Sequence, residues 1–236
     1  MAEDTASPSA RKNSVAAHSR RRSFFELAIA YALILLVIWT PRPWQKFLWW
    51  FAAAAVVIIT SISFDGLKAM GLRTANFLRS LWVVAAAIAV AAVAVIVAIQ
   101  LHTLRLPGGP ILFIKTYWAY ALWACVQQFL LLGFFLPRFL RLLPGAKSAV
   151  LLAAVLFALA HLPNPILTSV TFLWGLAACL VFLRYRNLYP LAMTHAILGI
   201  AIAITVPGPV DHNMRVGLGY LTYRHHAPHP VQLPQP

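Results

Sequence analysis

Long apolar stretches alternate with short polar and basic gaps along most of the chain. A helix of about 20 apolar residues crosses a bilayer and satisfies its own backbone hydrogen bonds there. The pattern therefore predicts an all-α fold, a polytopic membrane bundle of about seven transmembrane helices. The seven apolar runs are residues 24–40, 47–64, 81–99, 112–136, 148–162, 166–183 and 189–206.

The fifth run is the shortest, and its end leaves the number of spans open. It finishes in Leu162-Pro163-Asn164-Pro165, where two prolines remove backbone donors and stop a helix. Either a tight turn joins the fifth and sixth spans there, or the segment is re-entrant. Residues 148–183 therefore make two full spans or fewer.

Composition supports a membrane protein, because 61% of the residues are apolar and only 10% are charged. A soluble protein is nearer half apolar and a quarter charged. The formal net charge of +14 is also found in nucleic-acid-binding proteins. Here the basic residues lie in the gaps between apolar runs, so we expect the bilayer, and no nucleic acid, as the partner.

The distribution of basic residues predicts a cytoplasmic N-terminus, because Lys and Arg are enriched on the cytoplasmic side of short loops. With seven spans, the gaps on the same side of the membrane as the N-terminus hold about twice as many of the 19 Lys and Arg residues as the gaps on the other side do. The basic residues on the same side of the membrane as the N-terminus are Arg11, Lys12, Arg20, Arg21, Arg22, Lys68, Arg73, Arg79, Arg138, Arg141, Lys147, Arg184 and Arg186.

Four segments follow from this pattern. Residues 1–23 form a disordered basic cytoplasmic arm, and residues 24–110 hold the first transmembrane helices. Residues 111–206 hold the remaining spans, and residues 207–236 form a loosely ordered Pro- and His-rich tail that contains His225, His226 and His229. The first span lacks a small-residue cleavage site, so we expect it to be retained. We expect the protein to be an integral protein of the plasma (inner) membrane.

A few polar residues interrupt the later apolar runs, and polar side chains at membrane depth are costly and often functional. They are Gln127, Gln128, His161 and His195. At 1.5 Å per residue, Gln127, His161 and His195 lie roughly 15, 20 and 9 Å from the inner ends of their runs. We expect these side chains to line one cavity; alternatively, each bonds a neighbouring helix.

Three blocks of sequence around these residues resemble the CPBP family of intramembrane proteases, which includes the CAAX prenyl proteases. The family pattern is Glu-Glu-x-x-x-Arg before a glycine, then Phe-x-x-x-His, then His-x-x-x-Asn or Asp. The corresponding segments here are Gln127–Gly133, Phe157–His161 and His195–Gly199, within about residues 110–205. The resemblance implies that Gln127 and His161 take the water-activating positions, and that His195 and Gly199 take the positions that hold the oxyanion.

The chain departs from that pattern in three ways: both glutamates are glutamine, the arginine is Leu132, and the final amide is Gly199. A glutamine amide orients water but cannot act as a general base. The five carboxylates of the chain all lie outside the last four runs, at Glu3, Asp4, Glu26, Asp65 and Asp211.

Three alternatives remain for the missing base. His161 or His195 acts as the base; Asp211 and His212 fold back over the cavity and orient a histidine; or the site binds without cutting. Asn164 is a further candidate, as a source of the amide that Gly199 lacks. Two histidines and two glutamines fall short of a zinc ligand set, so we expect neither a metal nor a cofactor.

The resemblance implies an intramembrane endopeptidase that cleaves a membrane-attached protein or peptide near its C-terminus, for example a prenylated one. Two alternatives stay open. One is a catalytically degenerate relative that binds or chaperones a membrane substrate. The other is a small transporter or scaffold, although the last three runs contain no charged residue for coupling and the sequence shows no visible repeat.

Overall fold

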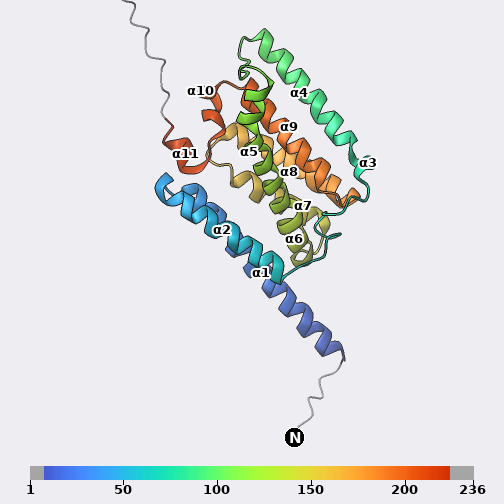
Figure 1. The fold of residues 1–236 in the computed structure, drawn as a ribbon. Coiled ribbons are helices and arrows are strands. Elements are labelled where there is room, and N and C mark those ends of the chain that lie inside the picture. The colour runs from blue at the N-terminus through green and yellow to red at the C-terminus, as the bar shows by residue number, and fades with distance from the viewer. Residues whose placement is uncertain (1–7, 224–236) are drawn as a thin grey trace, which may run out of the picture.

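The computed structural model describes residues 8–223, and within this range the regular structure is helical, without strands (Figure 1). This confirms the predicted all-α class. In chain order the elements are α1 (Pro8–Trp39), α2 (Arg42–Ile62), α3 (Phe77–Ser80), α4 (Trp82–Gln100), α5 (Pro110–Phe129), the π-helix η1 (Leu130–Phe135), α6 (Leu136–Leu142), α7 (Ala146–Leu159), α8 (Pro165–Tyr185), α9 (Tyr189–Thr205), α10 (Gly208–Asp211), the 3₁₀-helix η2 (His212–Met214) and α11 (Gly217–Leu221).

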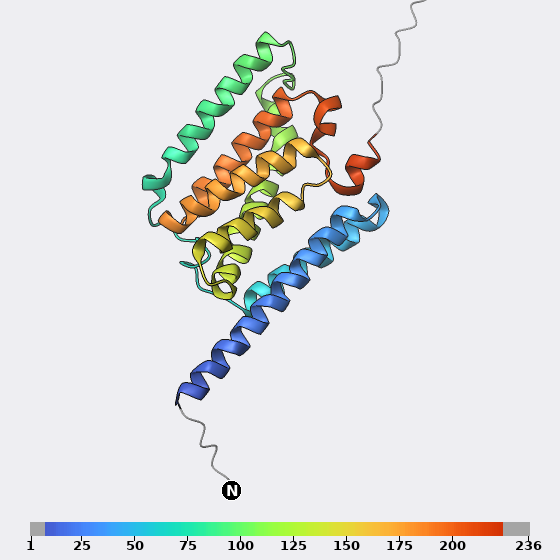
Figure 2. The same cartoon turned by 180° about the vertical axis from the view of Figure 1, so that it is seen from behind.

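Two parts of the bundle are visible from the front and from behind (Figures 1 and 2). Helices α1 and α2 form a long hairpin along one side, while α4 lies on the opposite side. Between them, α9 packs against both α4 and α5, and α7 packs along α8. The hairpin joins this body chiefly through α1 and α6.

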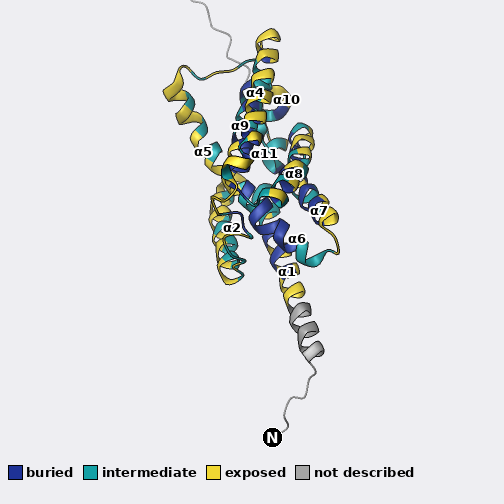
Figure 3. Cartoon of the chain, turned by 90° about the vertical axis from the view of Figure 1, so that its right-hand side faces the viewer, coloured by how far each residue is buried: buried dark blue, intermediate teal, exposed yellow. Residues whose placement is uncertain are grey.

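The core lies around η1 and α6, and the outer helices expose apolar side chains (Figure 3). Leu132 and Phe134 of η1 and Leu136 of α6 are completely buried. In contrast, Phe47 and Trp50 of α2 are about 70% exposed, at 72% and 70%. Such apolar surface suits lipid as the surrounding solvent, which is consistent with an integral membrane protein.

The predicted count of seven spans is not confirmed. Five helical stretches within residues 8–223 are long and apolar enough to cross a membrane: Ser19–Trp39, Arg42–Ile62, Phe77–Gln100, Pro110–Leu142 and Pro165–Tyr185. A sixth is counted if α9 continues into α10 and η2 across a 119° bend.

Helix α7 is one of the two predicted spans that are not counted, together with α9 when it is taken without its bent continuation. It has 14 residues, or about 21 Å at 1.5 Å per residue, and the hydrocarbon core is about 30 Å thick. The helix ends before Pro163, and Pro165 starts α8 with Asn164 as its N-cap. A tight turn therefore joins α7 to α8, and α7 is not counted among the helices long enough to span.

Residues 8–23 and 207–223 contain helices that the sequence pattern did not predict. Helix α1 begins at Pro8, so residues 8–23 are helical where a disordered arm was predicted. The physical reason is that no glycine or proline interrupts residues 9–39.

Residues 207–223 form α10, η2 and α11 instead of a loose tail. Gly217 (φ 54°) lets α11 approach Ile38 of α1 closely. The tail histidines His225, His226 and His229 lie outside the described residues.

A cluster of charged side chains ties the hairpin to the body, and we call it the charged clasp. Arg138 Nε donates to Glu26 Oε2 at 2.8 Å, and Arg22 Nε donates to Glu26 Oε1 at 2.8 Å. Arg141 Nη1 donates to Asp65 Oδ1 at 2.5 Å. Arg22 and Glu26 both lie in α1, Asp65 follows α2, and Arg138 and Arg141 lie in α6. The pairs made by Arg138 and Arg141 therefore join α6 to α1 and to the segment after α2.

Candidate functional site

The centre of the candidate site is a hydrogen-bonded trio from three helices. Gln128 of α5 is completely buried, and its Oε1 lies 2.9 Å from His195 Nδ1 of α9. Trp174 Nε1 of α8 donates to the same oxygen at 3.2 Å. Each of the three helices has a proline in its first turn, a position that proline favours. These prolines are Pro110, Pro165 and Pro190.

This trio determines which nitrogen of His195 carries the proton. An indole N–H only donates, so the group facing Trp174 must be the oxygen of the Gln128 amide. The His195 Nδ1 therefore donates to that oxygen, and Nε2 of the neutral ring keeps its lone pair. The site thus holds a nitrogen base whose tautomer is set by a neutral amide.

His161 has the same arrangement with a different acceptor. It follows α7, and its Nδ1 lies 2.7 Å from the carbonyl oxygen of Phe157, one helical turn earlier. A carbonyl only accepts, so Nδ1 carries the proton and Nε2 is free. The Phe157 ring lies edge-on to both imidazoles, with centroid distances of 5.1 Å to His161 and 5.8 Å to His195. One phenylalanine therefore holds both histidine rings in place.

Both histidines open onto one large cavity of about 1300 Å³ between the hairpin and the body. From the body it is lined by Gln127, His161, His195 and Gly199 among others. From the hairpin it is lined by residues that include Tyr31, Gln45 and Trp49. The side chains that the sequence placed in a shared cavity thus surround the same space, and most of the other lining residues are apolar.

The two neighbouring glutamines take different positions. Gln127, which the family resemblance places at the water-activating position, is half-buried and lines the cavity. Gln128 bonds His195 and leaves its Nε2 without a hydrogen-bond partner among the described residues. Gln127 is thus placed to meet a bound molecule, and Gln128 is placed to orient a histidine.

Asn164, Asp211 and His212 are used elsewhere. Asn164 Oδ1 accepts from Leu167 N at 3.1 Å, and its Nδ2 donates to the carbonyl of Asp211 at 2.7 Å. The Asp211 carboxylate accepts from Asn213 N, and the His212 ring stacks on Tyr220 at 4.0 Å. Within residues 8–223 none of the three bonds either site histidine. Asn164 therefore caps α8 and anchors the α10 segment, and Asp211 and His212 do not orient the imidazoles.

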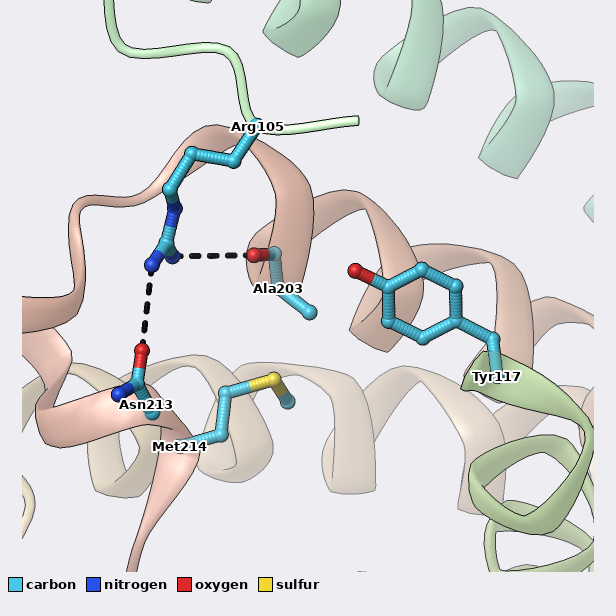
Figure 4. Close-up of a pocket in the computed structure, with 5 residues that line it drawn as sticks. All are labelled: Arg105, Tyr117, Ala203, Asn213 and Met214. Carbon is cyan, nitrogen blue, oxygen red and sulfur yellow. Dashed lines mark hydrogen bonds between the residues drawn. The ribbon is translucent and has the colours of Figure 1, made fainter. Parts of the chain in front are cut away.

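A smaller pocket of about 240 Å³ adjoins the cavity near the end of α9 (Figure 4). Arg105 lies over it, with Nη1 donating to Asn213 Oδ1 at 3.1 Å and Nη2 donating to the Ala203 carbonyl at 3.0 Å. Tyr117 and Met214 complete its lining, and both also line the large cavity. The pocket thus forms a cationic end to an otherwise apolar space.

The sequence pattern missed Trp174 and Arg105. Trp174 is one of eight tryptophans, and nothing in its neighbourhood separates it from an aromatic that faces lipid. Arg105 lies in a gap between runs, where basic residues are common in any membrane protein. Only the contacts across helices distinguish the two.

These elements define a polytopic α-helical membrane protein with a buried, uncharged histidine–glutamine site. Residues 109–201, from the start of α5 to the second half of α9, match the family described as type II CAAX prenyl endopeptidase Rce1-like. This confirms the resemblance to the CPBP family across that segment, which contains all three blocks. No curated protein and no solved structure matches the chain.

Proposed function

We propose that this protein is an intramembrane endopeptidase of the CAAX protease type in which a histidine replaces the glutamate as general base. The observation that carries the proposal is the pair His161 and His195. Both donate through Nδ1 to oxygen acceptors, and both line one sheltered cavity. A neutral imidazole with a free Nε2 is suited to accept a proton near neutral pH.

In the proposed reaction, the oxygen of a water attacks the scissile carbonyl carbon while His161 Nε2 takes one proton of that water. His195 Nε2 accepts a hydrogen bond from the other proton and so orients the attacking lone pair. When the tetrahedral intermediate collapses, the C–N bond breaks and His161 returns its proton to the leaving amine nitrogen. The step consumes one water and needs no carboxylate.

The shape of the cavity supports a substrate cut near its C-terminus. Along α9, Ala203 lies eight residues beyond His195, or about 12 Å at 1.5 Å per residue. An extended peptide covers roughly 10 Å with three residues. A chain whose scissile bond lies at His195 therefore brings its terminal carboxylate close to Arg105, which bonds the Ala203 carbonyl. The apolar hairpin wall suits the lipid of a prenylated cysteine in a C-terminal C-a-a-X sequence.

A second function is a relative that binds such substrates without hydrolysis. The observation in its favour is that no carboxylate of residues 8–223 lines the cavity. The neutral Gln127 amide occupies the position where the family pattern has a glutamate.

The decisive experiment reconstitutes the protein in liposomes with lipid-tethered peptides that end in a free carboxylate. We expect cleavage by the wild type, and a loss of about 10²- to 10⁴-fold in His161→Ala and in His195→Ala. His102→Asn is the matched control, because His102 is exposed in a loop with φ 55°, which asparagine tolerates. Binding of the same peptides without cleavage by the wild type would favour the second function.

We also propose that the N-terminus is cytoplasmic and that the protein resides in the plasma (inner) membrane. The excess of Lys and Arg in the gaps on that side supports this orientation. Reporter enzymes that are active on only one side of the membrane, fused before residue 1, test it. Activity of an exported reporter at this end would contradict the proposal.

A further inference from the structure

Gly199 of α9 and Tyr120 of α5 are in unusually close contact beside the site. Gly199 lies one helical turn after His195, so both face the same side of α9. A Cβ added at Gly199 would lie 1.6 Å from the Tyr120 hydroxyl oxygen. The absence of a side chain at Gly199 is therefore what allows the Tyr120 hydroxyl to lie there.

The Tyr120 hydroxyl has no hydrogen-bond partner among residues 8–223. Tyr120 lines the large cavity, in which the hydroxyl of another tyrosine, Tyr31, donates to the Leu156 carbonyl at 3.1 Å. A tyrosine hydroxyl can donate one hydrogen bond. Tyr120 thus presents an unused O–H donor at the cavity wall next to His195.

The other donors near the histidines are either used or do not line the cavity. Gln128 Nε2 and the hydroxyls of Thr168 and Thr194 have no partner among residues 8–223, but these residues do not line the cavity. The Nδ1–H groups of His161 and His195 donate to Phe157 and Gln128, which leaves both Nε2 atoms as acceptors. Trp174 Nε1 donates to Gln128, and the Thr171 hydroxyl donates to the Leu167 carbonyl at 2.6 Å. A developing oxyanion requires a donor, and the neutral imidazoles do not provide one. Among the donors that line the cavity beside the histidines, Tyr120 and Gln127 remain, and Tyr120 is the one that lies against α9 at Gly199.

We infer that Tyr120 donates its hydroxyl hydrogen bond to the carbonyl oxygen of a peptide bound beside His195, and so stabilises the oxyanion formed on attack by water. This inference rests on the proposed endopeptidase function. It makes Gly199 a residue that creates space for the donor, where the family pattern has a side chain that is itself the donor. The tyrosine keeps its proton throughout, so the balance of the cleavage step is unchanged.

The kinetic test compares Tyr120→Phe with wild type on the lipid-tethered peptides. Loss of one oxyanion donor is expected to lower kcat by about 10²- to 10³-fold with little change in KM. Tyr189→Phe is the control for loss of a tyrosine hydroxyl, because Tyr189 is exposed at the start of α9 and lines neither the cavity nor the Arg105 pocket. We expect it to stay within about twofold of wild type. An unchanged kcat in Tyr120→Phe, or the full loss in Gln127→Leu alone, would overturn the inference.

A binding test separates this inference from the proposed function, because it needs no cleavage. One lipid-tethered peptide carries a ketomethylene group in place of the scissile amide, and its partner carries two methylenes and lacks the carbonyl oxygen. Tyr120→Phe should weaken binding of the ketone about three- to tenfold, the value of one hydrogen bond, and leave the other ligand unchanged. If wild type fails to cleave but shows this difference, the proteolytic function fails and the role of Tyr120 stands. Equal affinity of wild type and Tyr120→Phe for the ketone peptide would contradict the proposed role of Tyr120.

A rescue variant tests the exchange of donors directly. Tyr120→Ala should lose activity, and Tyr120→Ala/Gly199→Asn should regain part of it, because an amide side chain then occupies the space that the tyrosine leaves. A merely structural role for the tyrosine ring predicts no recovery with asparagine and equal recovery with Gly199→Leu.

Discussion

The charged clasp and the histidine site place polar groups among apolar helices in opposite ways. In the clasp, Glu26 and Asp65 pair with Arg138 and Arg141, and Arg138 is completely buried. In the site, the buried Gln128 and His195 and the half-buried Trp174 carry no fixed charge. Two of the three carboxylates within residues 8–223 thus belong to the clasp, and none lines the cavity.

The difference teaches what each kind of contact can do. An ion pair between separate segments holds them firmly, because either charge left alone in an apolar setting is very costly. A neutral amide orients an imidazole without drawing a proton onto it, so the lone pair on Nε2 stays free for chemistry. The chain therefore uses charge to hold the hairpin and neutral hydrogen bonds to build the site.

The largest effect is expected from breaking the clasp. Glu26→Gln leaves the buried Arg138 with only Asp65, whose Oδ2 is 3.9 Å from Nη1. Uncompensated burial of that charge should cost about 3–5 kcal/mol of unfolding free energy, measured by denaturant unfolding in detergent. The double variant Glu26→Leu/Arg138→Leu should recover most of this loss, because it removes both charges. Equal stability of the single variant and wild type would show that the clasp contributes nothing.

The second-largest effect is expected at Gln128, the neutral amide that bonds His195 and Trp174. Gln128→Leu removes the acceptor shared by His195 and Trp174, so the imidazole loses its fixed tautomer. We expect cleavage to fall about 10- to 100-fold, as when a partner that orients an essential histidine is removed. The exposed Gln100→Leu is the matched control for glutamine loss. Full activity in Gln128→Leu would mean that the trio only packs the helices.

Asn164 tests a neutral contact that has a purely structural role. Asn164→Ala loses the cap of α8 and the bonds to the carbonyls of Asp211 and Arg215. We expect a loss of about 1–2 kcal/mol, together with faster hydrogen exchange in residues 207–223. Asn164→Asp keeps the capping oxygen and should lose less. Unchanged exchange in both variants would contradict the anchoring role.

The smallest effect is expected at Arg105, a cation outside the clasp. Arg105→Gln should raise KM about fivefold, or about 1 kcal/mol, for peptides that end in a carboxylate, and should not affect peptides that end in an amide. Arg105→Lys keeps the charge and should lie between the two. The exposed Lys115→Gln is the control for general loss of positive charge. A similar rise in KM for acid and amide peptides would exclude carboxylate recognition.

Much of the fold was predictable from the sequence, because the bilayer imposes a simple rule on composition. Apolar runs of sufficient length become helices, and Pro163 and Pro165 correctly marked the end of α7. The number of spans was harder to predict, because hydropathy does not separate a 14-residue helix in a sheltered position from a short span. The order of residues 207–223 also depends on distant partners, such as the bond from Gly217 N to the Leu162 carbonyl at 2.7 Å.

By itself, the sequence determined that this is a helical membrane protein, and it predicted a cavity shared by Gln127, His161 and His195, with separate interhelical bonds as the alternative. Only the tertiary structure decided that Gln128 holds His195 while the adjacent Gln127 faces the cavity. The physical reason is that neighbouring residues on a helix point about 100° apart, so which of them meets another helix depends on how the helices cross. The contact of Tyr120 with Gly199 was decided in the same way, by the close approach of α5 to α9.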